Sequence, residues 1–311
     1  MAAETKIEWT STIHPDGTKT PGATANFWWG CVKVSALCDH CYAETLDKRY
    51  GGSNWELDGR RRFIKSVWND LPKWNDLAQR TGQRKRVFVM SMGDFFEDLP
   101  KGHPDREEMQ AARIKAIHLM DTTWTSLDFL VLTKRISNVA KMVPARWTQG
   151  LWPRNVRLGI SVGTQKDAGR DIPRLLEIDC PNFLSMEPLL ERVDLTRIPM
   201  TFPYHAPALT NVLSVGPFGA GRYIRRIDWV ITGGESGPHA RPSHPDWFRF
   251  LRDQCAAADV PFHFKQGGAV LAKEWACSDK KGGITEELPV DLRIRQFPGD
   301  ALYDFAGRSN A

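Results

Sequence analysis

The stretch "RVFVMSMGD" at residues 86–94 is a nearly continuous apolar run that ends in small and polar residues. Strands buried on both faces of a parallel sheet have this pattern, whereas half-exposed strands alternate apolar and polar residues. Five later runs share it: "DFLVLTKR" (128–135), "NVRLGISVGTQ" (155–165), "NFLSMEPL" (182–189), "DWVITGGESG" (228–237) and "VPFHFKQGG" (260–268). We therefore expect these runs to be strands of one parallel sheet.

Segments with helical spacing of their apolar residues lie between these runs. In residues 103–123, the apolar residues Met109, Ala112, Ile114, Ile117 and Met120 recur at helical spacing, and acidic residues occupy the first turn. Similar segments are residues 137–147, 165–179 and 244–260. This order predicts an α/β fold with right-handed crossovers, a partial or complete parallel (β/α) barrel of six to seven strands. A flat doubly wound sheet fits the same pattern.

Two segments interrupt the alternation. Residues 191–227 are rich in Pro and Gly, and we interpret them as an insertion that carries a small hairpin. From about residue 270 the sequence looks like loops and short strands rather than another strand–helix unit. We expect a barrel domain over residues 1–270 and a C-terminal extension, 271–311, packed on it.

The composition is that of an ordinary globular protein, with 41% hydrophobic and 25% charged residues. No apolar run approaches the ~20 residues that span a bilayer. The N-terminal residues lack the apolar centre of a signal peptide. We expect a cytoplasmic protein that does not enter a membrane and whose thiols stay reduced.

The formal net charge of +5 favours an anionic partner such as nucleic acid or a nucleotide. Basic runs at 59–63, 80–86 and 221–226 are candidates for phosphate contact. The alternative for each run is an ordinary solvated surface.

Polar and charged residues follow each predicted strand. The carboxyl ends of parallel strands meet at one edge of a sheet, so we expect these side chains to surround a shared polar site. They are Ser91, Asp94, Thr133, Lys134, Arg135, Ser161, Thr164, Gln165, Ser185, Glu187, Gly233 to Ser236, Lys265 and Gln266. The alternative for any single one is a helix cap or a loop residue.

Three of the six cysteines, Cys31, Cys38 and Cys41, lie within eleven positions. Cys180 and Cys255 fall in predicted core segments and Cys277 is isolated, so no fourth cysteine ligand is evident. Three thiolates suit a 4Fe–4S cluster whose fourth iron is open to a ligand. A zinc site with its fourth ligand elsewhere in the chain, or a role without metal, are the alternatives.

These residues resemble the radical S-adenosylmethionine (SAM) enzymes, whose signature is three cysteines in a loop after the first barrel strand. His40 stands where that family has an aromatic residue, and Tyr42 follows the third cysteine. The six-residue gap from Cys31 to Cys38 is longer than the usual three and predicts a wider loop. "SMGDFFED" and "VLTKR" resemble strand-end motifs of the spore photoproduct lyase branch. Residues 4–270 also resemble a phage- and prophage-encoded family of radical-SAM-like proteins.

The resemblance implies a cluster on the three cysteines whose unique iron binds SAM, with flavodoxin or ferredoxin as an external one-electron donor. Cleavage of SAM then yields a 5′-deoxyadenosyl radical that abstracts hydrogen from the substrate. By position, the resemblance implies these cofactor-binding residues: His40, Tyr42, Ser91, Gly93, Asp94, Lys134, Ser161, Gln165 and Glu187. The residues assigned to substrate or catalysis are Gly233, Gly234, Glu235, Ser236, Arg241, Lys265 and Gln266.

The expected substrate is a nucleic acid or nucleotide, with modification or isomerisation of a thymidine derivative in phage DNA as the leading reaction. Repair of a thymine photoproduct is the next alternative, although Cys180, just before a strand, is poorly placed for it. A non-catalytic zinc-stabilised nucleic-acid-binding protein is another. A hydrolase or transferase that uses Lys134 and Glu187 for acid–base chemistry is the last. The location would be the host cytoplasm if the chain is phage-encoded.

Overall fold

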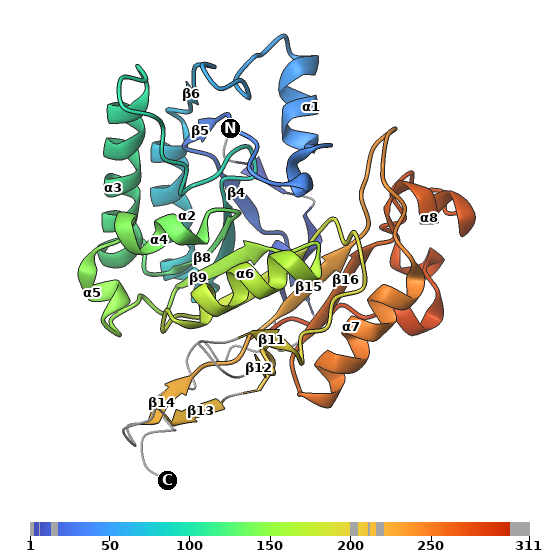
Figure 1. Cartoon of the computed structure of the whole chain (residues 1–311). Coiled ribbons are helices and arrows are strands. Elements are labelled where there is room, and N and C mark those ends of the chain that lie inside the picture. Colours follow the sequence, from blue (N-terminus) through green and yellow to red (C-terminus); the bar gives the residue numbers. More distant parts are fainter. Residues whose placement is uncertain are drawn as a thin grey trace. The chain divides into compact units, whose positions relative to one another are not determined.

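All six apolar runs are strands in the computed structural model of the chain (Figure 1). The structure describes residues 3–5, 7–13, 18–199, 205–210, 212–215 and 221–298. Two units, residues 1–159 and 160–311, each have their own dense set of internal contacts. The boundary falls inside strand β9 (Val156–Ser161).

In the first unit the strands of the main sheet are hydrogen-bonded in the order β1-β4-β7-β8, and β8 is followed by β9 at the boundary. Strand β1 is antiparallel to β4, whereas β4, β7 and β8 are parallel to one another. The described elements are β1 (Ala3–Glu4), β2 (Thr12–Ile13), β3 (Lys19–Thr20), β4 (Ala23–Ala25), β5 (Trp28–Trp29), α1 (Tyr42–Arg49), β6 (Arg62–Phe63), α2 (Val67–Thr81), β7 (Lys85–Val89), α3 (Arg106–Thr122), β8 (Leu127–Thr133), α4 (Ile136–Met142) and α5 (Ala145–Thr148).

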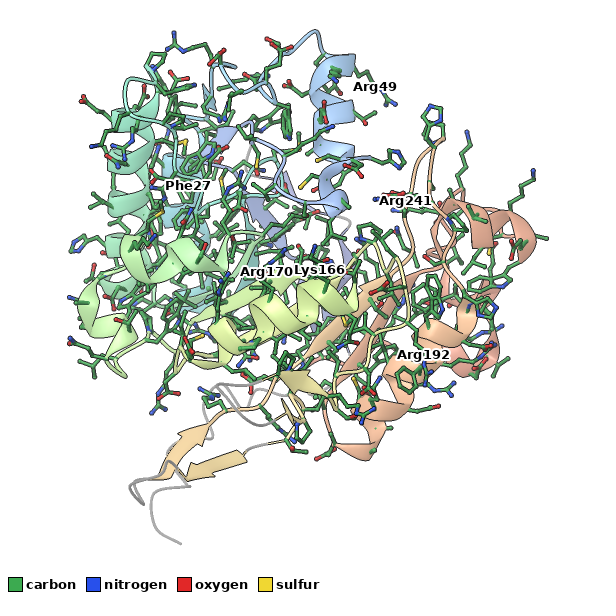
Figure 2. The ribbon with its side chains drawn as sticks, in the orientation of Figure 1. Phe27, Arg49, Lys166, Arg170, Arg192 and Arg241 are labelled. Atoms are coloured by element: carbon green, nitrogen blue, oxygen red, sulfur yellow. The ribbon has the colours of Figure 1, made fainter. Side chains whose placement is uncertain are left out.

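Aromatic side chains contribute a large part of the core of the first unit, together with aliphatic residues. Phe27 is buried in its interior (Figure 2), with its ring centroid 5.9 Å from that of Phe95. Helix α2 packs on β7 and β8, and it contacts α3 through Lys115, whose ammonium lies 4.3 Å from the Trp68 ring centroid. Each fully buried aromatic side chain stabilises the fold by about 1.5–3 kcal/mol. This packing supports the strand ends where the cysteine loop begins.

The second unit has parallel strands in the order β10-β15-β16. Its described elements are α6 (Gln165–Leu176), β10 (Asn182–Met186), β11 (Ile198–Pro199), β12 (His205–Ala206), β13 (Val212–Val215), β14 (Gly221–Ile224), β15 (Val230–Gly233), α7 (Pro245–Ala257), β16 (Phe262–Gln266) and α8 (Gly268–Glu274). Helix α7 packs on β15 and β16, and Phe248 meets Phe264 with ring centroids 4.9 Å apart. Helix α6 carries Lys166 and Arg170, whose side chains are labelled in Figure 2.

The predicted fold class is confirmed. The sheet has seven parallel strands within the described residues, as a partial parallel β/α barrel requires, with helices in the connections. The insertion at 191–227 contains two antiparallel pairs, β11–β12 and β13–β14. A barrel domain over 1–270 with an extension from 271 stays a prediction. Within the described residues, no helix is both long and apolar enough to cross a membrane.

Candidate functional site

Asn26 connects the end of β4 to the turn that follows β7. Its Oδ1 accepts a hydrogen bond from the Met92 N–H at 2.8 Å, and its Nδ2 donates to Ser91 Oγ at 3.0 Å. The Gly30 N–H in turn donates to the Met92 carbonyl at 3.0 Å. These bonds join the start of the cysteine loop to residues 90–93.

Gly30 and Gly93 face each other in an isolated parallel bridge. Gly30 has φ +113°, a conformation that side chains disfavour, and a Cβ at Gly93 would lie 3.0 Å from the Gly30 carbonyl oxygen. The backbone can therefore approach this closely because both positions are glycine.

The three cysteines occupy one loop between this bridge and helix α1. Cys31 directly follows Gly30, Cys38 ends a 3₁₀ turn, η2 (Ala36–Cys38), and Cys41 is the N-cap residue of α1. The long first gap accommodates the 3₁₀ turn. Cys31 and Cys41 pack against the same small apolar cluster of Ala43, Trp55 and Met92. Two of the thiols are thus brought to one patch of the loop.

Asp94 is a buried carboxylate at the end of the turn after β7. Oδ1 accepts from Thr133 Oγ1 at 2.7 Å and the Phe96 N–H at 3.0 Å, and Oδ2 accepts from the Lys134 N–H and Arg135, each at 3.0 Å. Burial alone would raise the pKa of Asp94, but the Arg135 charge and these bonds hold it below its ordinary value. With four donors, Asp94 organises the strand ends and offers no free carboxylate to a ligand's amino group.

Arg135 reaches from the end of β8 into the cysteine loop. One terminal nitrogen donates to Asp94 Oδ2 at 3.0 Å and Cys31 Sγ at 3.2 Å, and the other donates to the Val32 carbonyl at 2.6 Å. The second nitrogen also lies 3.5 Å from Glu97 Oε1. Neighbouring carboxylates raise the pKa of this guanidinium despite its burial. The side chain is a permanent cation beside the first cysteine.

Glu97 and Arg61 complete the buried charge network. The Arg61 side chain is 0% exposed and donates to both Glu97 oxygens, at 3.0 and 3.1 Å. Glu97 Oε1 also accepts from the Val32 N–H at 2.7 Å. Both backbone groups of Val32 are thus held, its N–H by Glu97 and its carbonyl by Arg135.

The loop has the donor chemistry of a cluster site with three cysteine ligands. All three cysteines are free thiols, and each is neither fully buried nor fully exposed. Burial raises the pKa of Cys31, and the adjacent Arg135 opposes this rise. Among the described residues, no three His, Cys, Asp or Glu side chains converge on one point as metal ligands. Three cysteines in one loop are the donor set that a 4Fe–4S cluster would need, but the three thiols do not converge on one point.

Three other predicted cofactor residues lie beside this loop. The Tyr42 hydroxyl donates to the Ser91 carbonyl at 2.6 Å, which connects α1 to the turn after β7. His40 is exposed in the loop. Lys134 is half-buried, and within the described residues its Nζ makes no hydrogen bond or ion pair, although its N–H is held by Asp94. Lys134 therefore presents an ammonium group that a ligand carboxylate can bind.

In the second unit, Glu187 and Lys265 are brought together from β10 and β16. Lys265 Nζ lies 2.5 Å from Glu187 Oε2, and Glu187 Oε1 is buried without a hydrogen-bond partner among the described residues. Strand β15 lies between these strands and ends in Gly233 and Gly234. A Cβ at Gly234 would lie only 2.0 Å from the Gly267 carbonyl oxygen. The glycine pair is thus explained by close backbone contact.

Glu235 and Arg241 pair with each other within one loop. Arg241 donates to Glu235 through its N–H at 2.7 Å, its Nε at 3.0 Å and a terminal nitrogen at 2.6 Å. Figure 2 labels Arg241 on this loop. Gln266 donates to the Gly234 carbonyl at 3.1 Å, and Ser236 is half-buried. These contacts give Glu235, Arg241 and Gln266 a structural role in the loop.

Ser161 and Gln165 flank the start of α6. Ser161 Oγ is buried in β9 without a hydrogen-bond partner among the described residues. The Gln165 side chain makes two hydrogen bonds to the Asp194 backbone, at 2.6 and 3.1 Å. Gln165 therefore fastens the segment after β10 to α6.

Most described cations of the basic runs already have protein partners, which weakens their assignment to phosphate. The pairs are Arg60 with Asp105, Arg61 with Glu97, Arg62 over Trp29, Arg84 with Asp128, Lys85 with Glu4, Arg86 with the Ser11 carbonyl, Arg225 with Asp179 and Arg226 with the Ala258 carbonyl.

Sequence reasoning did not assign Asn26, Arg61, Glu97 or a cysteine contact of Arg135. Glu97 lies in the "FFED" motif and Arg135 in the "TKR" motif, so both charges were visible in the sequence. Which acid each arginine binds was not, because the paired residues are 36 or more positions apart and are brought together only by the tertiary structure.

A family model described as "Protein of unknown function (DUF5131)" matches residues 4–289. No curated protein and no solved structure matches the chain.

Proposed function

We propose that the chain, which belongs to the DUF5131 family of proteins of unknown function, is a radical SAM enzyme with a 4Fe–4S cluster on Cys31, Cys38 and Cys41. The observation that carries this proposal is the position of the cysteine loop. The loop follows β4, the first parallel strand, and precedes the later strand–helix units. When bound, such a cluster supplies the electron that cleaves SAM.

The chain's own residues bind and orient in this proposal. Lys134 offers an ammonium group, without a partner among the described residues, to the SAM carboxylate, and its backbone N–H is bound to Asp94. Tyr42 and Asn26 fix the turn 90–93 from two sides, so its backbone keeps one conformation beside the loop. His40, exposed before the third cysteine, borders the same ligand.

The substrate we propose is a nucleic acid or nucleotide, with a thymidine derivative in phage DNA as the leading case. The net charge of +5 supports an anionic substrate. The basic runs support it less, because their described cations are mostly paired. In the second unit, Ser161 Oγ and Glu187 Oε1 are buried without a hydrogen-bond partner among the described residues. The electron donor would be a flavodoxin or a ferredoxin.

The test is anaerobic reconstitution with iron and sulfide, followed by SAM and dithionite. The wild-type chain should bind about three to four irons and form 5′-deoxyadenosine. Cys38→Ala should lose both, whereas Cys277→Ala, a matched cysteine outside the loop, should keep both.

One tightly bound zinc without SAM cleavage would refute the enzyme and favour a zinc-stabilised binding protein. Mass analysis of DNA nucleosides from cells with and without the gene tests the substrate. A new thymidine derivative supports DNA modification, and loss of a thymine photoproduct supports repair instead. Cys180 is fully buried, which disfavours a repair role for that thiol.

A further inference from the structure

Arg135 is the cation in contact with the first cysteine of the loop. We infer that Arg135 is a positioning residue that fixes Cys31 and raises the reduction potential of the bound cluster. The inference rests on the proposed function, because it concerns the cluster which that function requires.

The contacts of Arg135 match what only a guanidinium can make. Its two terminal nitrogens donate hydrogen bonds to Cys31 Sγ at 3.2 Å, Asp94 Oδ2 at 3.0 Å and the Val32 carbonyl at 2.6 Å. The side chain is only 10% exposed, so these bonds form in a region of low dielectric constant. A lysine has one nitrogen and cannot hold the same three acceptors in this plane.

The charges around Cys31 determine the sign of the change in reduction potential. Asp94 and Glu97 are both buried, and Arg135 contacts both carboxylates as well as the sulfur. N–H bonds to a ligating sulfur, and positive charge beside it, stabilise the more negative reduced cluster. Removal of Arg135 takes away a donor and also leaves Asp94 without its cationic partner. Both changes lower the reduction potential.

The experiment compares wild type with Arg135→Lys and Arg135→Gln. Arg113→Lys is the matched control, since Arg113 is also buried and donates to the Phe95 and Glu97 carbonyls, each at 2.6 Å. Among the described residues it makes no hydrogen bond to a cysteine. The measurements are iron per chain, the midpoint potential from an EPR-monitored redox titration, and hydrogen exchange of residues 30–34 in the metal-free protein.

We expect both Arg135 variants to titrate at more negative potential than wild type, with Arg135→Gln shifted further. Arg135→Gln should also exchange the amides of residues 30–34 faster. Arg113→Lys should match wild type in both measurements. If Arg135→Gln does not retain iron while Arg113→Lys does, the positioning role is supported.

Unchanged potential and exchange in both Arg135 variants would overturn the inference, as would an equal shift in Arg113→Lys. If wild type binds no iron, the proposed function fails. Exchange in the metal-free chain then decides the positioning role by itself.

Discussion

Replacing Asp94 by Asn tests whether the buried charge network holds the cysteine loop in place. The substitution keeps the shape of the side chain but removes the charge. It also turns one accepting oxygen into an NH₂ group that faces donors. Asp94 accepts from four donors, and two of them, Arg135 and the Lys134 N–H, share Oδ2.

The expected cost follows from these contacts. Removing one partner of a buried ion pair costs about 3–5 kcal/mol, because the remaining charge is buried and uncompensated. Glu97 stays 3.5 Å from Arg135 and compensates part of that charge. We therefore expect a loss of about 3 kcal/mol in the free energy of unfolding, a large share of the ~5–15 kcal/mol typical of a domain.

Urea unfolding, followed by the fluorescence of the 12 tryptophans, measures this change. Asp98→Asn is the matched control, because Asp98 is 49% exposed and pairs with Arg106 at the surface, where an ion pair contributes about 0–1 kcal/mol. A loss below about 1 kcal/mol for Asp94→Asn, no greater than that of the control, would contradict the reasoning.

Three further predictions concern stability. Because the pKa of Asp94 is lowered, its contribution is complete above about pH 4 and is lost as the pH falls below that, so acid unfolding of Asp94→Asn should depend less on pH. Gly234→Ala should destabilise the second unit by more than about 3 kcal/mol, because the new Cβ would clash with the Gly267 carbonyl oxygen. A melting temperature equal to that of wild type would show that this close contact does not exist. Lys265→Met should cost about 1–3 kcal/mol by leaving Glu187 partly buried without its cation, and calorimetry should show it.

Exposed positions on α6 supply the controls for the second unit. Lys166 is exposed on that helix, so Lys166→Met should change the free energy of unfolding by no more than about 0.5 kcal/mol. An effect as large as that of Lys265→Met would show that loss of any lysine destabilises this unit.

The main strands could be predicted from the sequence because their runs are apolar on both faces. Strand β4 could not, since three residues, Ala23–Ala25, carry no pattern. It is a strand because it pairs with β7. Helix α2 was also missed, although Val67, Leu71 and Ala78 have helical spacing; Pro72 inside it breaks the usual signal. The tail from 270 was expected to hold loops and short strands, but α8 begins it.

Part of the candidate site could also be predicted from the sequence, and part could not. The cysteine loop was visible because cysteine clusters are rare, and its neighbours at the ends of β7 and β8 follow from parallel topology. What each carboxylate binds could not be predicted. Asp94 and Glu235 were expected to face ligands, and instead they pair with Arg135 and Arg241. The sequence contains more arginines than buried carboxylates, and only the tertiary structure determines which arginine binds which carboxylate.

The bonds at Gly30, Val32 and Cys31 are all made by protein groups: the Met92 carbonyl, Glu97 and Arg135. In zinc fingers, by contrast, the metal itself drives the chain to fold. Here the hydrogen bonds at the entry to the loop involve no metal, so the cluster that we propose would load into a chain whose loop entry is already folded. A chain stripped of that proposed cluster would keep these hydrogen bonds, and reloading it would then require iron and sulfide without refolding of the loop entry.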